Sequence, residues 1–147
     1  MSDKHDEWVA KAREVTATLA VDAAARDRTG AEPIAEVKLL KGAELLGLLI
    51  PQALDGAGQT WRTALAVVRE IARADGSIAQ LIGYHYVNSS NLWLAGDRPI
   101  QERLGRLTAA RQWLWGDAVN PVEPDLTLTP AETGYPGSAV SSQSSRR

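Results

Sequence analysis

Residues 77–96 read SIAQLIGYHYVNSSNLWLAG and contain no Asp, Glu, Lys or Arg. This stretch predicts a helix from residue 78 to about residue 94, with Asp75 or Ser77 as its N-cap and Gly96 at its end. A helix without charged side chains is usually buried. We therefore expect it to lie in a core that it shares with the other helices.

One face of this helix carries uncharged polar side chains. Gln80, Tyr84, Asn88 and Asn91 fall on it at positions i, i+4, i+8 and i+11. Buried polar groups need hydrogen-bond partners or line a cavity. The face is therefore either part of a satisfied core or the wall of a ligand pocket. His85, taken alone, is more typical of a core histidine than of a catalyst.

Four further helices are predicted from apolar residues at helical spacing. They cover residues 6–28, 33–46, 60–74 and about 97–107. Gly30 is expected to end the first, and Gly47 to end the second in a left-handed conformation. Asp97 is the expected N-cap of the last.

Two of these helices have a predicted buried face. In the helix at 60–74 this face consists of Trp61, Leu65, Val68 and Ala72. In the helix that starts near residue 97, the expected inner edge consists of Ile100, Leu104 and Leu107.

The character of the sequence changes after residue 111. Trp113-Leu114-Trp115 and residues 125–129 are predicted strands, and residues 130–134 are a predicted hairpin turn. From residue 136 the sequence is rich in serine, a composition typical of disorder.

The sequence thus predicts a mainly α fold class with three parts. They are a domain of about five helices over residues 1–111, the start of a β domain over 112–135 and a disordered tail over 136–147. The abrupt change at Tyr135 predicts a frameshift or a truncation near that residue.

Composition excludes several kinds of site. The chain has no cysteine, which excludes disulfides, thiolate metal sites and a cysteine nucleophile. Its two histidines are too few for a multi-histidine metal centre, so no metal site is expected. The net charge of −2 argues against nucleic-acid binding, and no apolar segment approaches the ~20 residues of a membrane-spanning helix.

Motif searches leave the reaction open. No GxSxG, HExxH or phosphate-binding glycine loop is present, so spacing alone names no chemistry. The polar N-terminus and the absence of cysteine favour a cytoplasmic location.

Five segments together resemble the N-terminal region of the acyl-CoA dehydrogenase superfamily. They are ARDR at 25–28, LLGLLIP at 45–51, GAGQTW at 56–61, VVREIARADGS at 67–77 and GYH at 83–85. Within the superfamily they are most similar to the flavin-dependent monooxygenase branch of the dibenzothiophene monooxygenase type. The similarity covers roughly residues 10–135.

The resemblance implies the N-terminal helical domain of a larger enzyme that continues with a β domain and a four-helix bundle. In that branch, FMNH2 supplied by a separate flavin reductase forms a flavin hydroperoxide, which transfers oxygen to a sulfur-containing or other heteroatom substrate. The intact enzymes are homo-oligomers that act on a small molecule, without nucleic acid or membrane partners. Two alternatives stay open: an FAD-dependent acyl-CoA dehydrogenase fragment and a non-catalytic helical interaction remnant.

The resemblance also implies site residues. Those of the substrate pocket are Gln80, Tyr84, His85 and Asn88, and those that bind the cofactor are Trp115, Gly116, Asp117 and Ala118. Gln80 occupies the place of a histidine, and Asp117 that of an asparagine, in the dibenzothiophene enzymes. An ionised carboxylate accepts hydrogen bonds but cannot donate one. Because the β domain and the bundle supply most of the flavin contacts, the 147-residue chain alone is expected to be inactive and not to retain flavin.

Overall fold

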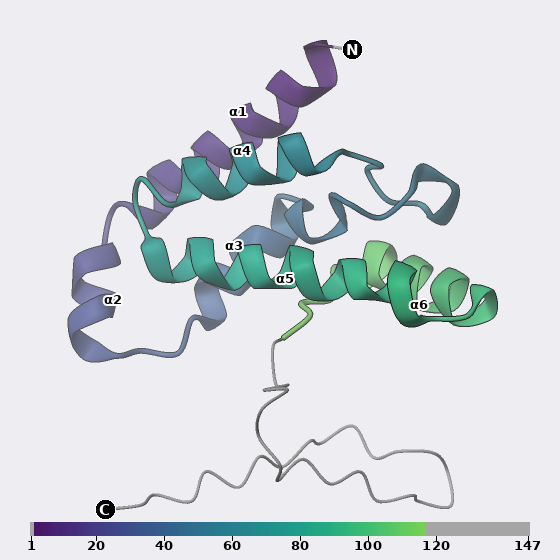
Figure 1. Cartoon of the computed structure of the whole chain (residues 1–147). Helices are drawn as coiled ribbons and strands as arrows, with labels where there is room; N and C mark the ends of the chain where they lie inside the picture. Colours follow the sequence, from purple (N-terminus) through teal and green to yellow (C-terminus); the bar gives the residue numbers. More distant parts are fainter. Residues whose placement is uncertain (1, 117–147) are drawn as a thin grey trace, which may run out of the picture. The chain divides into compact units, whose positions relative to one another are not determined.

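The structure is a computed structural model that describes residues 2–116 (Figure 1). Its helices are α1 Ser2–Leu19, α2 Ala23–Thr29, α3 Ile34–Gly42, α4 Trp61–Ile71, α5 Gly76–Ala95 and α6 Arg98–Arg111. Two 3-10 turns, η1 Leu45–Gly47 and η2 Gln52–Leu54, lie between α3 and α4. No strand occurs within residues 2–116. The mainly α class is therefore confirmed, while the strand, turn and tail predicted after residue 117 lie outside the described residues.

The helices share one main core. α1 packs along α4, and α4 packs along α5, so α4 lies between the other two (Figure 1). Turn η1 contacts α3, α5 and α6. The large buried side chains are Leu19, Leu40, Leu45, Leu46, Leu48, Val67, Ile71, Ile82 and Tyr86. Burying one such aliphatic side chain contributes about 1.5–3 kcal/mol, so the segment around η1 belongs to the core as fully as the helices do.

The predicted first helix at 6–28 is wrong as a single element. The chain turns at residues 20–22 and continues as the short α2, which ends at Gly30 with φ 61° as expected. The turn brings Arg26 back to the Leu19 carbonyl, at 3.2 Å, and to Asp75, at 2.7 Å. A partner 49 residues away is invisible to local periodicity.

The second predicted helix is also shorter than expected. α3 ends at Gly42, and the left-handed residue that follows is Glu44, with φ 61°, rather than Gly47. Gly47 lies in η1, where a Cβ would stand 2.8 Å from Nε2 of Gln112. A side chain at this position would push the amide group of Gln112 aside, whereas the backbone angle of Gly47 is not in the left-handed region.

The predicted buried face of α4 is wrong in its rotation about the helix axis. The buried residues are Thr63, Ala64, Val67 and Ile71, whereas Trp61 and Leu65 are 44% and 56% exposed. α4 carries two apolar stripes. The buried stripe has the smaller side chains, whereas Trp61 and Leu65 of the other stripe remain exposed.

The two cap predictions for the later helices are confirmed. Asp75 accepts a hydrogen bond from the Ile78 amide at 3.0 Å at the start of α5, and Asp97 accepts one from the Ile100 amide at 3.0 Å at the start of α6.

The predicted inner edge of α6 is displaced by one residue. Its buried residues are Gly105, Thr108 and Ala109, while Leu104 and Leu107 are half-buried and Ile100 is exposed. Gly105 is in close contact with Leu54 and Trp93, since a Cβ there would lie 2.8 Å from Leu54 Cδ1.

The predicted strand at 113–115 is not formed within the described residues. These residues follow α6 as irregular backbone, held by side chains rather than by a neighbouring strand. None of the helices described in residues 2–116 combines the length and the apolar character that crossing a bilayer requires.

Candidate functional site

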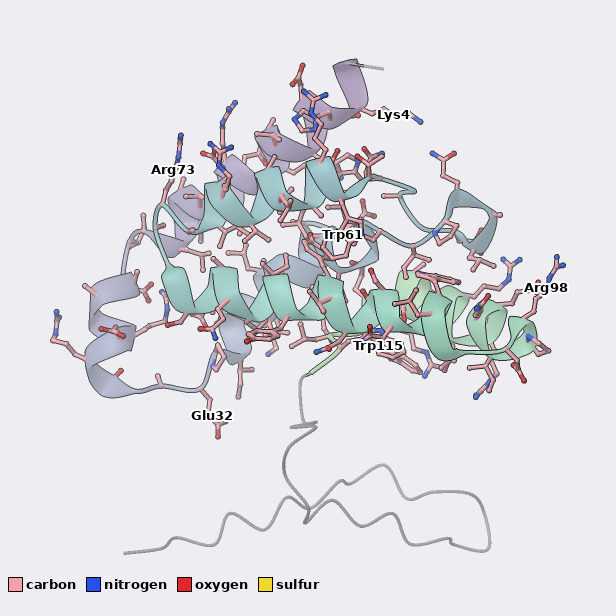
Figure 2. The ribbon with its side chains drawn as sticks, in the orientation of Figure 1. Lys4, Glu32, Trp61, Arg73, Arg98 and Trp115 are labelled. Atoms are coloured by element: carbon pink, nitrogen blue, oxygen red, sulfur yellow. The ribbon has the colours of Figure 1, made fainter. Side chains whose placement is uncertain are left out.

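The segment after α6 is held in place by side chains of α5 and α6. The Trp115 amide donates to Nδ1 of His85 at 3.1 Å, and Nδ2 of Asn88 donates to the Gly116 carbonyl at 3.1 Å. The Trp115 indole donates to Oγ1 of Thr108 at 3.0 Å. Figure 2 labels Trp115 at this position beside α5. Two residues predicted for the substrate pocket thus meet two predicted for the cofactor.

His85 is a buried core residue, with 0% of its surface exposed. Its Nε2 lies 2.8 Å from the Leu46 carbonyl oxygen. Burial lowers the pKa of His85 to about 4, against which the hydrogen bond to Leu46 acts only in part. The imidazole is therefore neutral at pH 7. His85 lines neither of the two hollows described below, because it lies inside the core, and its role in a substrate pocket stays a prediction.

Tyr86 ties the same part of α5 to η1. Its hydroxyl donates to the Leu45 carbonyl at 3.0 Å, and its ring centroid lies 5.4 Å from that of His85. Burial raises the pKa of Tyr86 well above its ordinary value, so the hydroxyl remains a donor. Two neighbouring residues of α5 thus satisfy two consecutive carbonyls of η1.

Gln80 and Tyr84 lie on the other side of α5, in a groove against α4. The groove has a volume of about 370 Å³. It is lined by Trp61, Leu65, Val68, Ala79, Gln80, Gly83, Tyr84, Tyr86 and Val87. Trp61 projects from the start of α4 toward α5 (Figure 2).

The groove is apolar apart from its rim. Gln80 is exposed, and Tyr84 is 46% exposed. Sequence reasoning missed Trp61 and Leu65 as groove residues because it placed them in the core. A second apolar stripe on α4 was the signal that could have revealed them.

The predicted site residues therefore fall into two groups. Gln80 and Tyr84 line the groove, whereas His85 and Asn88 contact the segment at 115–116. The two groups meet on α5, because Asn88 follows Tyr84 by one helical turn. Asp117 and Ala118 lie outside the described residues.

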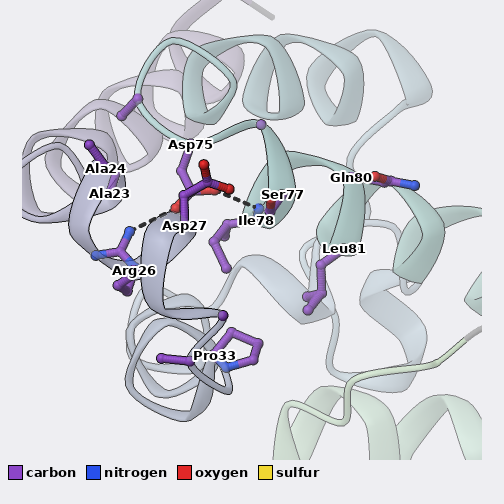
Figure 3. A pocket seen from close by; sticks show the side chains of 14 residues that line it. Ala23, Ala24, Arg26, Asp27, Pro33, Asp75, Ser77, Ile78, Gln80 and Leu81 are labelled. Atoms are coloured by element: carbon purple, nitrogen blue, oxygen red, sulfur yellow. Dashed lines mark hydrogen bonds and ion pairs between the residues drawn. The ribbon is translucent and has the colours of Figure 1, made fainter.

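A second hollow, of about 760 Å³, lies between α2 and the start of α5 (Figure 3). Arg26 reaches it and forms ion pairs with Asp22, with Glu36 at 3.2 Å and with Asp75 at 2.7 Å. Burial acts to raise the pKa of Asp75, but hydrogen bonds from Ile78 and Arg26 outweigh it and leave that pKa below its ordinary value.

This arginine cluster has a structural explanation. Arg26 joins α2, α3 and the cap of α5, because its one guanidinium forms an ion pair with a carboxylate of each. Across residues 2–116 no group of three His, Asp or Glu side chains is arranged to hold a metal ion.

The exposed end of the described segment would accept one side of a flat cofactor. Gly116 is exposed, and a Cβ added there would meet nothing within 4 Å, so a ligand can approach its backbone closely. The groove between α4 and α5 has no basic residue in its lining. The exposed Gly116 backbone thus leaves room for a flat ring, and the groove lining offers no basic side chain to a phosphate.

Comparison with known proteins identifies the family and the fold. The family model described as "Acyl-CoA dehydrogenase, N-terminal domain" matches residues 2–110. The protein named "Probable FMNH2-dependent monooxygenase SfnC" from Pseudomonas putida is 42% identical over 116 residues, which make up 78% of this chain and 29% of that protein.

Two solved structures share the fold. Methanesulfinate monooxygenase MsuC from Pseudomonas fluorescens superposes with a TM-score of 0.80 at 33% identity, covering 84% of this chain and 32% of that one. The dibenzothiophene monooxygenase TdsC from Paenibacillus sp. A11-2, in complex with FMN and indole, gives a TM-score of 0.80 at 31% identity, covering 88% and 33%.

The chain spans about a third of the length of these proteins. The resemblance drawn from the five sequence segments is confirmed, and the relatives are flavin-dependent monooxygenases, one of them named as FMNH2-dependent and one solved with FMN. Since the family match extends over most of the chain, this protein belongs to the family of acyl-CoA dehydrogenase N-terminal domains.

Proposed function

We propose that this chain forms one wall of the active site of an FMNH2-dependent monooxygenase that acts on a small sulfur-containing molecule. The observation that carries the proposal is the junction on α5. There the apolar groove with Tyr84 on its rim lies one helical turn from the side chain that holds Gly116. The names of the relatives supply the reaction class.

The groove suits an apolar or aromatic substrate with one polar end. Its walls are Trp61, Leu65 and Val68 of α4 together with Val87 of α5. Burial of apolar substrate surface would provide affinity. A polar group at the rim would orient the bound molecule.

Tyr84 is the side chain best placed to orient such a substrate. Within residues 2–116 its hydroxyl makes no hydrogen bond and remains available to donate or accept one. Gln80, one turn earlier on the same face, can do both as well. These two residues would recognise a sulfur oxide or another polar substituent.

The segment at 115–118 would lie against the flavin ring. When bound, FMN supplies the oxygen-transfer chemistry, and this chain would bind substrate beside it and exclude water with the aromatic and aliphatic groove residues. Asp117 could accept a hydrogen bond from the ring but could not donate one while ionised.

The remaining assignments are part of the same proposal. The helical domain would end near residue 111, a β domain would begin near 112, and the segment from 136 would lie outside both. A cytoplasmic flavin reductase would supply FMNH2, and the complete enzyme would be a homo-oligomer. Because phosphate contacts are absent from the groove lining, residues 2–116 would bind FMN weakly.

The test is an FMN titration of isotope-labelled chain, followed through its backbone amide resonances. We expect localised shifts at Tyr84, Asn88, Trp115 and Gly116 that remain unsaturated at millimolar FMN. Leu65→Ala serves to probe the groove, and Leu94→Ala, at an exposed position of α5 outside it, is the matched control. Uniform or absent shifts would refute the proposal that this chain forms one wall of the active site. Saturable micromolar binding would show instead that the chain holds a complete flavin site.

A substrate titration tests the second half of the proposal. Indole is a soluble aromatic probe, and TdsC has been crystallised with it. It should shift Tyr84 and Val87 in the wild type, and Tyr84→Phe should weaken a probe with a polar substituent more than a purely apolar one. Equal effects on both probes would make Tyr84 a packing residue.

A further inference from the structure

The backbone that leads into the proposed flavin contact is fixed on both sides of Trp115. α6 ends at Arg111, and its C-cap residue Gln112 adopts a left-handed conformation with φ 48°. Its side-chain oxygen accepts from the amides of Leu46 and Gly47, both at 3.1 Å, and its nitrogen donates to the Ala109 carbonyl at 2.9 Å. The exit from α6 is therefore tied to η1 before the chain reaches residue 113.

The next ties come from α5 and bind backbone atoms. His85 accepts from the Trp115 amide, and Asn88 donates to the Gly116 carbonyl. Because the first bond involves an amide hydrogen and the second a carbonyl oxygen of successive residues, together they fix the orientation of this part of the backbone as well as its position.

The bonds of His85 define its tautomer. A backbone amide can only donate, so Nδ1 must be the unprotonated acceptor. Nε2 then carries the hydrogen and donates it to the Leu46 carbonyl at 2.8 Å. A neutral imidazole has one donor and one acceptor, and here both are used, to η1 on one side and to Trp115 on the other.

We propose that His85 and Asn88 are positioning residues that fix the backbone of Trp115 and Gly116, and hence the place where the chain meets the flavin. This assignment rests on the proposed function. Neither side chain needs to touch the flavin or the substrate. His85 links η1 to the contact segment from inside the core, and Asn88 holds its exposed end.

Asn and Gln substitutions separate this role from simple core filling. The amide of His85→Asn can place its oxygen near the Nδ1 position and keep the bond to Trp115. The longer side chain of His85→Gln can place its nitrogen near the Nε2 position and keep the bond to Leu46 instead. Both variants remove the ring, so a core-filling residue would be damaged by either one alike.

The measurement is hydrogen exchange of the Trp115 amide in the full 147-residue chain, read by NMR. In His85→Gln we expect exchange to be about five- to tenfold faster than in the wild type, as for the loss of one hydrogen bond. In His85→Asn it should stay within about twofold of the wild type. Equal acceleration in both variants would overturn the positioning role of His85.

Asn88 provides a test that does not disturb the core, since its side chain is only half-buried. Asn88→Asp keeps the size but cannot donate to the Gly116 carbonyl when ionised. We expect a changed Gly116 carbonyl resonance with unchanged amides at Leu45 and Leu46, and partial recovery in Asn88→Gln. An unchanged Gly116 carbonyl resonance in Asn88→Asp would contradict the role of Asn88. This measurement remains decisive if both His85 variants fail to fold.

An FMN titration of the same variants separates the two proposals. If the positioning is correct and relevant to flavin, the FMN-induced shift of Gly116 is retained in His85→Asn and lost in His85→Gln and Asn88→Asp. If the exchange pattern is as expected but FMN moves no amide even in the wild type, the proposed function fails and only the anchoring of the backbone stands.

Discussion

Lowering the pH should destabilise this fold, because the buried imidazole of His85 resists protonation that the unfolded chain accepts. The pKa of His85 falls from 6.5 to about 4 on folding. The unfolded chain therefore takes up a proton near pH 6.5, and the folded chain does so only near pH 4. The stabilisation is complete above pH 6.5 and is lost as the pH falls through this interval.

The size of the effect follows from the two pKa values. Each unit of pKa difference corresponds to about 1.4 kcal/mol, so the full interval is worth about 3 kcal/mol. Most of it is expected between pH 7.5 and pH 4.5. The groups that face His85 do not titrate there: Leu46 and Trp115 contact it through backbone atoms, and burial keeps Tyr86 protonated.

Urea unfolding at pH 7.5 and pH 4.5 measures this loss directly. The wild type should lose about 2–3 kcal/mol of unfolding free energy. His85→Asn, which has no group that titrates in this range, should lose much less over the same interval, whatever its stability at pH 7.5. His5→Asn is the control, because it also removes one imidazole but does so away from this site, where His5 bonds to the Thr63 hydroxyl. Equal losses in the wild type and in His85→Asn would refute the buried neutral histidine.

Three further pairs of substitutions test the packing. Arg26→Ala leaves Glu36 and Asp75 without their cation and should cost about 3–5 kcal/mol in urea unfolding, whereas Arg98→Ala, in an exposed pair, should cost less than about 1 kcal/mol. Ile71→Ala, in the core, should lower the free energy of unfolding by about 2–5 kcal/mol, and Leu65→Ala, at an exposed position, by well under that. A larger loss of melting temperature in Leu65→Ala than in Ile71→Ala would support the orientation of α4 that the sequence predicted. Gly47→Ala should destabilise the fold because it displaces the side chain of Gln112. Gly42→Ala, in open space at the end of α3, should stabilise the fold by up to about 1 kcal/mol. Stabilisation by both substitutions would show that the Gln112 side chain moves aside at no cost.

The parts of the fold that local chemistry decides could be predicted from the sequence. Asp75 and Asp97 cap helices because a carboxylate there satisfies an amide three residues ahead. Gly30 ends α2 because it adopts a positive φ at low cost. In each case cause and effect lie within one turn of the chain.

The parts that long-range contacts decide could not be predicted. The break between α1 and α2 depends on Arg26 meeting Asp75 far along the chain. The orientation of α4 depends on which of its two apolar stripes α1 and α5 select. Periodicity finds that a helix has a stripe, but it does not choose between two that are both apolar.

The candidate site shows the same division. Spacing placed Gln80, Tyr84 and Asn88 on one face of the helix, and the structure brings the first two to the groove. Spacing could not reveal that His85 points inward, because its partners are backbone atoms of η1 and of the segment after α6. Every residue type offers a backbone carbonyl and nearly every type a backbone amide. A sequence motif therefore cannot show which residue is the hydrogen-bond partner.

The absence of charge on α5 now has two separate physical causes. On its inner side, His85 and Tyr86 satisfy the carbonyls of Leu46 and Leu45, where a permanent charge would carry a desolvation penalty of several kcal/mol. On its outer side, Tyr84 and Val87 line an apolar groove that a charge would make less suitable for an uncharged ligand. The neighbours Tyr84 and His85 therefore serve different purposes: substitutions at Tyr84 should change ligand selectivity with little loss of stability, and those at His85 should change stability and the position of residues 115–116 together.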